Sequence, residues 1–478
     1  MSKPFPTDNP FLRGYYAPLS AECDAANLPV TGELPRELFG TLYRNGPNPQ
    51  FAPRGPYHWF SGDGMLHAFH LENGRVSYRN RWVRTPKWEL EHAEGEGLSG
   101  AFGSPRFSDP RIVALRSTTA NTNVVWHAGR LLALEEAHAP FEVDPETLAP
   151  KGYQQFDGKL AGPMTAHPKI DPVTGEMVFF GYAAKGPFSA DMMLHVAGKD
   201  GRLVRSEHFT APFASMVHDF VVTRTHIIFP IFPLTGSMER AMKGLPPYAW
   251  EPDRGTHIGI MPRGGSVAEL RWFTGDPCYV FHPMNAFDDA DGSVVCDMVK
   301  YDVAPLFPRP DGSPTGARSP DAKLVRWRFD LAGDSNGFRE TPLDDRPAEF
   351  PRLDERRSML PYRHGYLNST PGLATARAEG QRWGLSHIDL HGGDVVSWQP
   401  EAGDACGEPV FVPRSAGAAE GDGWLLNVIW RGAENRSDLA VFDATDLAAK
   451  PVALAHLSHR VPAGFHGNWR DGGTLAFG

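Results

Sequence analysis

Four histidines in this chain stand in short segments of apolar and small residues, of the kind that end buried strands. They are His167 in Met-Thr-Ala-His, His218 in Ser-Met-Val-His, His282 in Tyr-Val-Phe-His and His466 in Ala-Gly-Phe-His. Their spacing is wide and irregular, whereas a zinc finger has tight local pairs of ligands. A spread of this kind is expected where each ligand comes from a different repeat unit, and imidazole suits iron, copper, nickel or zinc. If the four rings converge, the chain is a metalloenzyme or a scaffold stabilised by a metal.

Three glutamates occupy equally apolar settings. They are Glu136 in Leu-Glu-Glu-Ala, Glu349 in Pro-Ala-Glu-Phe-Pro-Arg and Glu408 in Gly-Glu-Pro-Val-Phe-Val-Pro-Arg. A buried carboxylate is costly without a partner, and a metal-bound imidazole needs an acceptor for its second nitrogen. Each glutamate taken singly could instead form a salt bridge at a strand edge, for instance with Arg352 or Arg414. As a set, they are better explained as the outer partners of metal-binding histidines.

The other histidines carry less information, because the chain has 19 of them. Surface or hydrogen-bonded roles are expected for most of them, and we apply this expectation to eight: His58, His67, His127, His138, His195, His257, His387 and His459.

The elements that must position these residues are predicted to be short strands. Patches rich in Val, Ile, Phe and Trp alternate with turn signals, at 111–115, 122–126, 131–135, 177–182, 219–223, 226–230, 293–299, 324–329, 383–388, 395–398, 424–430 and 439–442. Only Ser237–Leu245 is predicted to be a helix, because Met238, Met242 and Leu245 fall on one face. That face either packs on the body or forms an apolar entrance that touches a membrane surface.

The organisation of the chain favours one large closed β architecture. Acidic, glycine-rich turns recur between strand patches, as at Asp288-Asp-Ala-Asp-Gly, and 50 glycines and 44 prolines favour short strands over helices. A propeller closes many short strands without exposed edges. We expect residues 1–30 to form an irregular arm, residues 31–478 a single propeller domain, and residues 302–321 a long surface loop.

Composition excludes several classes of protein. The net charge of −10, with no basic cluster, argues against a nucleic-acid partner. The four cysteines form no Cys-x-x-Cys pair, so isolated reduced thiols are expected. The N-terminal residues have no apolar core typical of a signal peptide, and no run approaches a membrane span. The sequence therefore predicts a cytoplasmic protein.

Longer motifs give the chain a resemblance to a known family. Gly40-Thr-Leu-Tyr-Arg-Asn-Gly-Pro-Asn-Pro, Phe60-Ser-Gly-Asp-Gly-Met-Leu and Gly464-Phe-His-Gly-Asn-Trp, with the histidine and glutamate contexts in order, resemble the carotenoid cleavage oxygenases. This family includes apocarotenoid oxygenases, lignostilbene dioxygenases, isoeugenol-type monooxygenases and a retinoid isomerase. The stretches that begin at Ala120 and Ala166 are most similar to the bacterial stilbene and phenylpropene branch.

The resemblance implies a fold, a cofactor and a site. The fold would be a seven-bladed β-propeller with a helical and loop cap over the iron face. The four histidines would bind one Fe(II) per chain, with O2 as co-substrate, and Glu136, Glu349 and Glu408 would hydrogen-bond three of them. Thr122 would lie near a vacant coordination position. The activity would be cleavage of a conjugated C=C bond into two carbonyl products.

One departure from the stilbene branch bears on the substrate. Where that branch has a tyrosine and a lysine that hold a phenol oxygen, this chain has Phe102 and Glu135, which cannot stabilise a phenolate. An apocarotenoid is therefore the leading substrate, and a stilbenoid or phenylpropene is the alternative. A non-oxidative isomerase and a binding propeller are the other readings left open. Besides Phe102 and Glu135, the pocket candidates are Phe60, Phe281 and Phe465; the oligomeric state is not predicted.

Overall fold

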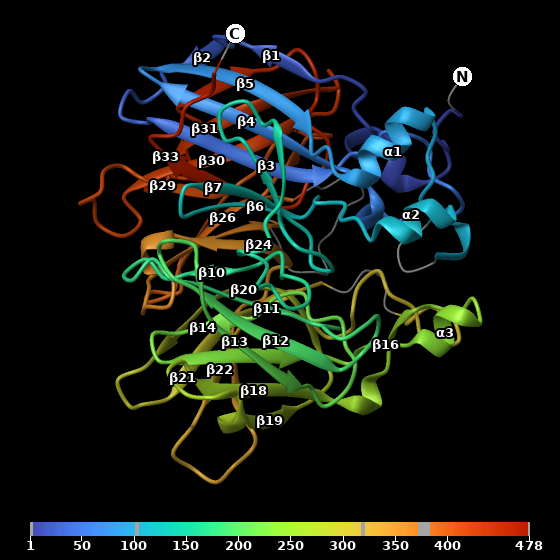
Figure 1. The fold of residues 1–478 in the computed structure, drawn as a ribbon. Helices are drawn as coiled ribbons and strands as arrows, with labels where there is room; N and C mark the ends of the chain where they lie inside the picture. Colours follow the sequence, from blue (N-terminus) through green and yellow to red (C-terminus); the bar gives the residue numbers. More distant parts are fainter. Residues whose placement is uncertain (1–2, 101–104, 317–320, 371–382, 477–478) are drawn as a thin grey trace. The chain divides into compact units, whose positions relative to one another are not determined.

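The computed structural model describes residues 3–100, 105–316, 321–370 and 383–476 (Figure 1). The chain divides into two compact units. Unit 1 comprises Met1–Gln155, Gly380–Ser386 and Val396–Gly478, and unit 2 comprises Phe156–Glu379 and His387–Val395. Seven sheets and a two-stranded hairpin run through the described ranges. The seven sheets are the blades of a seven-bladed β-propeller, as the family resemblance implies.

Unit 1 contains three complete sheets. The first has the order β1 (Cys23–Ala25), β5 (Arg75–Trp82), β4 (Gly64–Glu72), β3 (Gly40–Pro47) and β33 (Gly467–Asp471). The second has the order β2 (Val30–Gly32), β32 (Ala453–His456), β31 (Arg436–Asp443), β30 (Gly423–Arg431) and β28 (Ala405–Cys406), and β29 (Val410–Pro413) also pairs with β30. The third runs from β6 (Asn123–His127) through β7 (Arg130–Leu134) and β8 (Phe141–Val143) to β9 (Pro150–Tyr153).

Unit 2 contains three further sheets. They are β10 (Lys169–Ile170), β11 (Met177–Gly181), β12 (Asp191–Ala197) and β13 (Leu203–Thr210); β14 (Val221–Val222), β15 (His226–Ile231), β18 (Thr256–Pro262) and β19 (Arg271–Gly275); and β20 (Tyr279–Asp288), β21 (Val294–Tyr301), β22 (Lys323–Phe329) and β23 (Arg339–Asp344). The hairpin is β16 (Leu234–Gly236) with β17 (Tyr248–Trp250). The seventh sheet has the order β24 (Ala348–Leu353), β25 (His364–Ser369), β26 (Gly384–Asp389) and β27 (Val395–Trp398).

Strand pairing joins the two ends of the chain in unit 1. The C-terminal strand β33 pairs with β3, with Gly40 opposite Asp471 and Arg44 opposite Gly467. This pairing covers an edge of the first sheet that would otherwise be open. It also fixes the residue before β33, which is His466.

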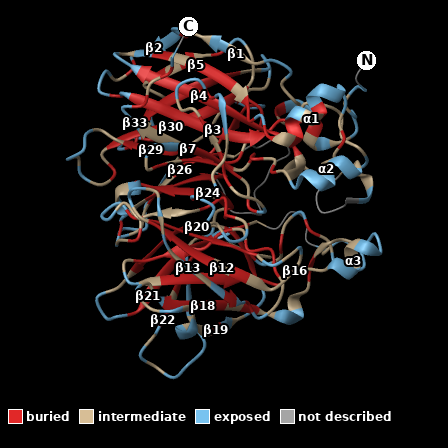
Figure 2. Cartoon of the chain, viewed as in Figure 1, coloured by how far each residue is buried: buried red, intermediate tan, exposed pale blue. Residues whose placement is uncertain are grey.

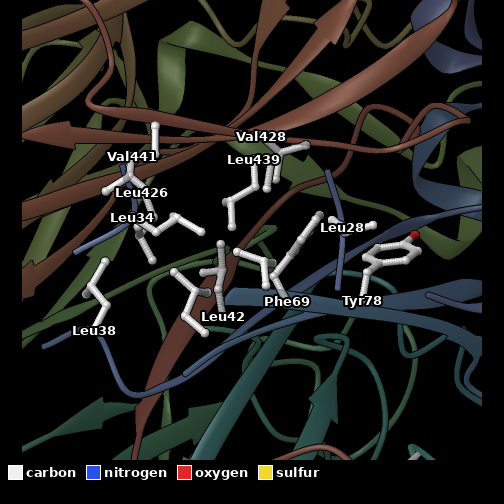
Figure 3. Close-up of a cluster of buried hydrophobic side chains, with 14 of the residues drawn as sticks. Leu28, Leu34, Leu38, Leu42, Phe69, Tyr78, Leu426, Val428, Leu439 and Val441 are labelled. Carbon is white, nitrogen blue, oxygen red and sulfur yellow. The ribbon is translucent and has the colours of Figure 1, made fainter. Parts of the chain in front are cut away.

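One core cluster of unit 1 lies between its first and second sheets, and another lies between its first and third sheets. Figure 3 shows Leu42 and Phe69 from the first sheet facing Leu426 and Leu439 from the second. Phe69 and Leu439 have no exposed surface. Each such side chain contributes about 1.5–3 kcal/mol when fully buried. In Figure 2 the strands are largely buried, and the loops that connect them are largely exposed.

One expected strand is a helix. Residues 111–115 belong to α2 (Pro110–Leu115), because Asp109 caps the first turn by accepting from the backbone N–H of Arg111, and Pro110 occupies the first helical position. The prediction of a strand was wrong because a short apolar run has no decisive period. The other expected strand patches, within three residues at their ends, coincide with strands of the structure.

Helix α1 (Pro86–Glu94), which lies beside α2 in Figure 1, was not predicted from the sequence. Thr85 caps its start, and Gly95 ends it with a φ of 70°. The buried ammonium of Lys87 holds α1 to the start of β4, because it lies 2.5 Å from Asp63, just before that strand, and 2.9 Å from Glu91 in α1 itself.

The expected helix of residues 237–245 is present as α3 (Met238–Met242), capped by Ser237. No helix in the described ranges is long and apolar enough to cross a membrane. Within residues 1–30, the structure has two 3-10 turns at Pro10–Leu12 and Gly14–Tyr16, and strand β1. A division into an arm and one propeller domain remains a prediction.

Candidate metal centre

Three of the four histidines each lie at the first strand of a sheet. His167 precedes β10, His218 precedes β14, and His282 lies within β20. At His282 the pairing of β20 with β21 shifts register between Val280 and Pro283. The apolar residues before each histidine are buried strand or loop positions, which explains the sequence contexts.

The ring nitrogens of these three histidines converge. Nε2 of His218 lies 3.0 Å from Nε2 of His167 and 3.3 Å from Nε2 of His282. Three nitrogens this close in a largely buried setting favour a shared positive ion or proton, because each ring presents a lone pair or an N–H to the same point.

A glutamate fixes the outer nitrogen of His282. Glu349, in β24, accepts from Nδ1 of His282 at 2.6 Å, from the hydroxyl of Tyr301 at 2.7 Å and from the N–H of Phe350 at 2.7 Å. Burial favours protonation, but His282 and these hydrogen bonds outweigh it, so the pKa of Glu349 stands below its usual range. An ionised Glu349 places the proton of His282 on Nδ1 and leaves Nε2 free to bind a metal.

The fourth histidine, His466, is held by a carboxylate in the same way. Nδ1 of His466 lies 2.9 Å from Oε1 of Glu408, and the N–H of Gly467 donates to Oε2 of the same carboxylate at 2.8 Å. The N–H of His466 also donates to the carbonyl of Thr122 at 3.2 Å, just before β6. His466 and Glu408 are both buried.

One nitrogen from each of the four histidines lies within 4.8 Å of the others, and we call this group the four-histidine cluster. Metal–imidazole bonds of about 2.0–2.1 Å place adjacent ligand nitrogens about 3 Å apart. The separations of 3.0 and 3.3 Å fit such an edge. The donor set therefore fits a single metal ion, and neutral imidazoles suit a divalent transition metal.

Comparison with known proteins agrees with the fold and the site. The family model described as retinal pigment epithelial membrane protein (RPE65) matches residues 16–471. This family is that of the carotenoid oxygenases. The chain belongs to it.

Relatives in the carotenoid oxygenase family are similar over nearly the whole chain. Isoeugenol monooxygenase of Pseudomonas nitroreducens is 37% identical over 469 residues, which are 97% of this chain and 98% of that one. The crystal structure of a Pseudomonas brassicacearum lignostilbene dioxygenase has a TM-score of 0.93 at 37% identity, and covers 98% of this chain and 100% of its own.

A further relative bears on the metal. Cobalt-substituted apocarotenoid oxygenase of Synechocystis has a TM-score of 0.83 at 30% identity, with 95% of this chain and 97% of that chain covered. A metal that cobalt can replace in a carotenoid oxygenase agrees with the single-ion fit of the four-histidine cluster. These three relatives are all named as oxygenases, and this chain is an enzyme of the same family.

The remaining predicted residues lie at varied places. Glu136 is buried just beyond β7. The hydroxyl of Thr122 donates to the side chain of Asn121 at 3.0 Å, while its carbonyl accepts from His466. The rings of Phe60 and Phe465 lie 5.7 Å apart, and the ring of Phe281 lies edge-on to His218 at 5.3 Å. Phe102 lies outside the described residues.

Glu135 is already engaged as a hydrogen-bond acceptor. Its Oε2 atom lies 2.8 Å from Nδ1 of His138 and accepts from the hydroxyl of Thr118 at 3.1 Å. Burial opposes ionisation, but His138 and these bonds hold the pKa of Glu135 below its usual range. The Glu135 carboxylate in turn raises the pKa of His138. His138 is one of the histidines for which only a surface or hydrogen-bonded role is expected from the sequence.

Two residues near the cluster escaped the sequence analysis. Tyr301 donates to Glu349, and Asp219 lies beside His167. For Tyr301 the sequence holds no signal, because β21 is one of many apolar strands. Asp219 follows His218 directly, and a carboxylate next to a candidate ligand could have been noted.

Proposed function

We propose that this protein is a ferrous-iron oxygenase that cleaves a conjugated carbon–carbon double bond with O2 into two carbonyl products. The observation that carries the proposal is the four-histidine cluster, with nitrogens within 4.8 Å of one another and carboxylates on the outer nitrogens of His282 and His466. Membership of an oxygenase family supports the same chemistry. We propose one iron ion per chain, held by His167, His218, His282 and His466.

The metal ion and the glutamates around it have separate roles in this reaction. Ferrous iron, when bound, supplies the redox chemistry and open positions that activation of O2 needs. Glu349 and Glu408 keep their imidazoles turned so that Nε2 faces the cluster, and we assign the third such role to Glu136. Each carbon of the alkene receives one atom of O2, so no proton is gained or lost and no acid or base is required.

The apolar residues near the cluster would hold and orient the substrate. We propose Phe60, Phe281 and Phe465 as lining residues, with Thr122 near an open coordination position. Burial of apolar area would supply most of the affinity for an apolar alkene. Placing one double bond of several beside the oxygen would then decide which bond is cleaved.

An apocarotenoid is the leading substrate in this proposal. Glu135 is an ionised acceptor occupied by His138 and Thr118, and such a group does not stabilise a phenolate. A stilbenoid or phenylpropene is the second candidate, because the relatives named for isoeugenol and lignostilbene are more similar to this chain than the apocarotenoid oxygenase is.

Product analysis tests the proposed function. The iron-loaded protein should convert an apocarotenal into two carbonyl fragments, with one O2 consumed per alkene, and mass spectrometry would identify them. A resveratrol-type stilbene and isoeugenol complete the panel and decide between the two substrate classes. Turnover without O2 consumption would indicate a non-oxidative isomerase. No product from any alkene would leave only a binding propeller.

We also propose peripheral contact with a membrane through α3. Met238, Met242 and Leu245 are 45%, 83% and 38% exposed, and Arg240 holds the segment through an ion pair of 3.2 Å with Glu251, just beyond β17. Met242→Glu should lower the fraction of protein that sediments with phosphatidylcholine vesicles, since a charge on the exposed face opposes burial in lipid. Equal sedimentation of both proteins would contradict the proposal.

A cytoplasmic location is proposed on the state of the cysteines. Cys23, Cys278 and Cys296 are free thiols, and the last two are buried. Reduced cysteines are typical of proteins in a reducing compartment.

A further inference from the structure

Asp219 is a buried carboxylate that the roles assigned so far do not use. Its side chain is 4% exposed, and it directly follows His218 in the loop before β14. A carboxylate this deeply buried needs partners, because removing its charge from water is costly. The partners it has are therefore informative about its role.

The two carboxylate oxygens of Asp219 have different surroundings. Oδ1 accepts from the ammonium of Lys169 at 2.7 Å and from the N–H of Phe220 at 2.6 Å. Oδ2 lies 3.7 Å from Nδ1 of His167. Lys169 and Phe220 thus hold the carboxylate by one oxygen and leave the other turned toward the imidazole.

The orientation of His167 matches that of His282. In both rings Nε2 lies in the cluster, at 3.0 and 3.3 Å from Nε2 of His218. In both rings Nδ1 points to a carboxylate, which is Glu349 at 2.6 Å for His282 and Asp219 at 3.7 Å for His167. A separation of 3.7 Å is too long for a direct hydrogen bond. A shift of the ring by less than about 1 Å, or one bridging water, would complete it.

We propose that Asp219 is the carboxylate that positions His167 for metal binding, and that Lys169 holds Asp219 in place. This inference rests on the proposed role of His167 as a metal ligand. It assigns His167 an acidic partner of the kind that Glu349 gives to His282. Asp219 is a positioning residue, since it would act through the imidazole and not on the substrate.

Lys169 also explains how the fold tolerates the buried charge. The Lys169 ammonium lies 2.7 Å from Oδ1 of Asp219 and offsets the negative charge that is buried there. Lys169 itself lies in β10, two residues after His167, so one short segment supplies both the ligand and the cation that anchors its partner. His167 and Lys169, which lie on either side of the Asp219 carboxylate, are therefore both held by β10 and the residues just before it.

Metal binding by Asp219→Asn tests the inference in the full chain. The amide keeps the shape of the side chain, but a nitrogen that donates cannot accept from Nδ1–H of His167. Affinity for Co(II) and for anaerobic Fe(II) should fall about 10- to 100-fold, as for loss of other outer partners of metal-bound histidines. The visible absorption of bound Co(II) should also change, because the ligand orientation changes; a purely structural role would not alter that spectrum in folded protein.

Two further variants calibrate the result. Glu349→Gln should weaken binding to a similar degree. Asp288→Asn is the matched control, since Asp288 pairs with Nδ1 of His226 at 3.0 Å in the same unit, in a histidine–carboxylate pair that does not belong to the cluster. It should bind metal like the unaltered protein.

The outcomes separate this inference from the proposed function. Folded Asp219→Asn with unaltered affinity and an unaltered Co(II) spectrum would overturn the role of Asp219 alone. If that variant does not fold, Lys169→Gln carries the test: weaker binding supports the inference, and binding within twofold of the unaltered protein overturns it. Failure of the unaltered protein to bind one ion would instead overturn the proposed metal site, whatever the variants do.

Discussion

His218→Ala is expected to abolish alkene cleavage and to remove most of the bound metal. Nε2 of His218 is the nitrogen that lies close to both neighbours, 3.0 Å from His167 and 3.3 Å from His282. Without this nitrogen, the cluster loses the ligand atom that lies next to both His167 and His282. The loss of affinity should exceed the roughly 10- to 100-fold effect of removing an outer partner. Metal content per chain and product formation from an apocarotenal are the two measurements.

The matched control for this variant is His391→Ala. His391 is exposed, in the turn after β26, so its removal should change neither the metal content nor the rate. Wild-type activity in His218→Ala, with the metal still bound, would refute the ligand assignment. A loss of activity in both variants would point to a general effect on the protein.

Removal of the metal should have an equally large effect and should be reversible. A chelator should eliminate activity, and one equivalent of Fe(II) per chain should restore it under anaerobic loading followed by addition of O2. Zn(II) should occupy the same nitrogens without restoring turnover, because it has no redox chemistry. Activity and bound metal are measured together during the titration.

The same titration has a thermodynamic readout. A ligand that binds only the folded state stabilises it, by about 2.7 kcal/mol when its free concentration is 100 times the dissociation constant. The metal-free protein should therefore unfold at a lower temperature, and both Fe(II) and Zn(II) should raise that temperature again. Full activity after exhaustive chelation would exclude the proposed cofactor.

The sequence was most informative where a residue type is unusual for its setting. A histidine at the end of an apolar strand, or a glutamate in one, is costly unless it has a partner, so these residues stand out without knowledge of the fold. Glu349 and Glu408 were selected in this way, and each lies beside a histidine in the structure. Their pairing was implied by the resemblance to a family, because no local spacing links Glu408 to His466.

Local structure was predictable where the period or the capping residues are clear. The methionine spacing of α3 marks a helix. The apolar run of α2 has no such spacing. Asp109 as the N-cap and Pro110 at the first helical position are the signal that distinguishes this helix from a strand. Helix α1 was missed because its polar residues hide its period, although Thr85 and Gly95 mark its ends.

By itself the sequence determined the class of fold, the candidate ligands and the chemistry that neutral imidazoles permit. These features depend on composition, on residue types and on the immediate neighbours of each residue in the sequence. Only the tertiary structure decided which carboxylate lies beside which imidazole ring. Asp219 follows His218 along the chain, yet it faces Nδ1 of His167 and is anchored by Lys169. Contacts between separate strands depend on how the sheets pack, and the order of residues along the chain does not encode them locally.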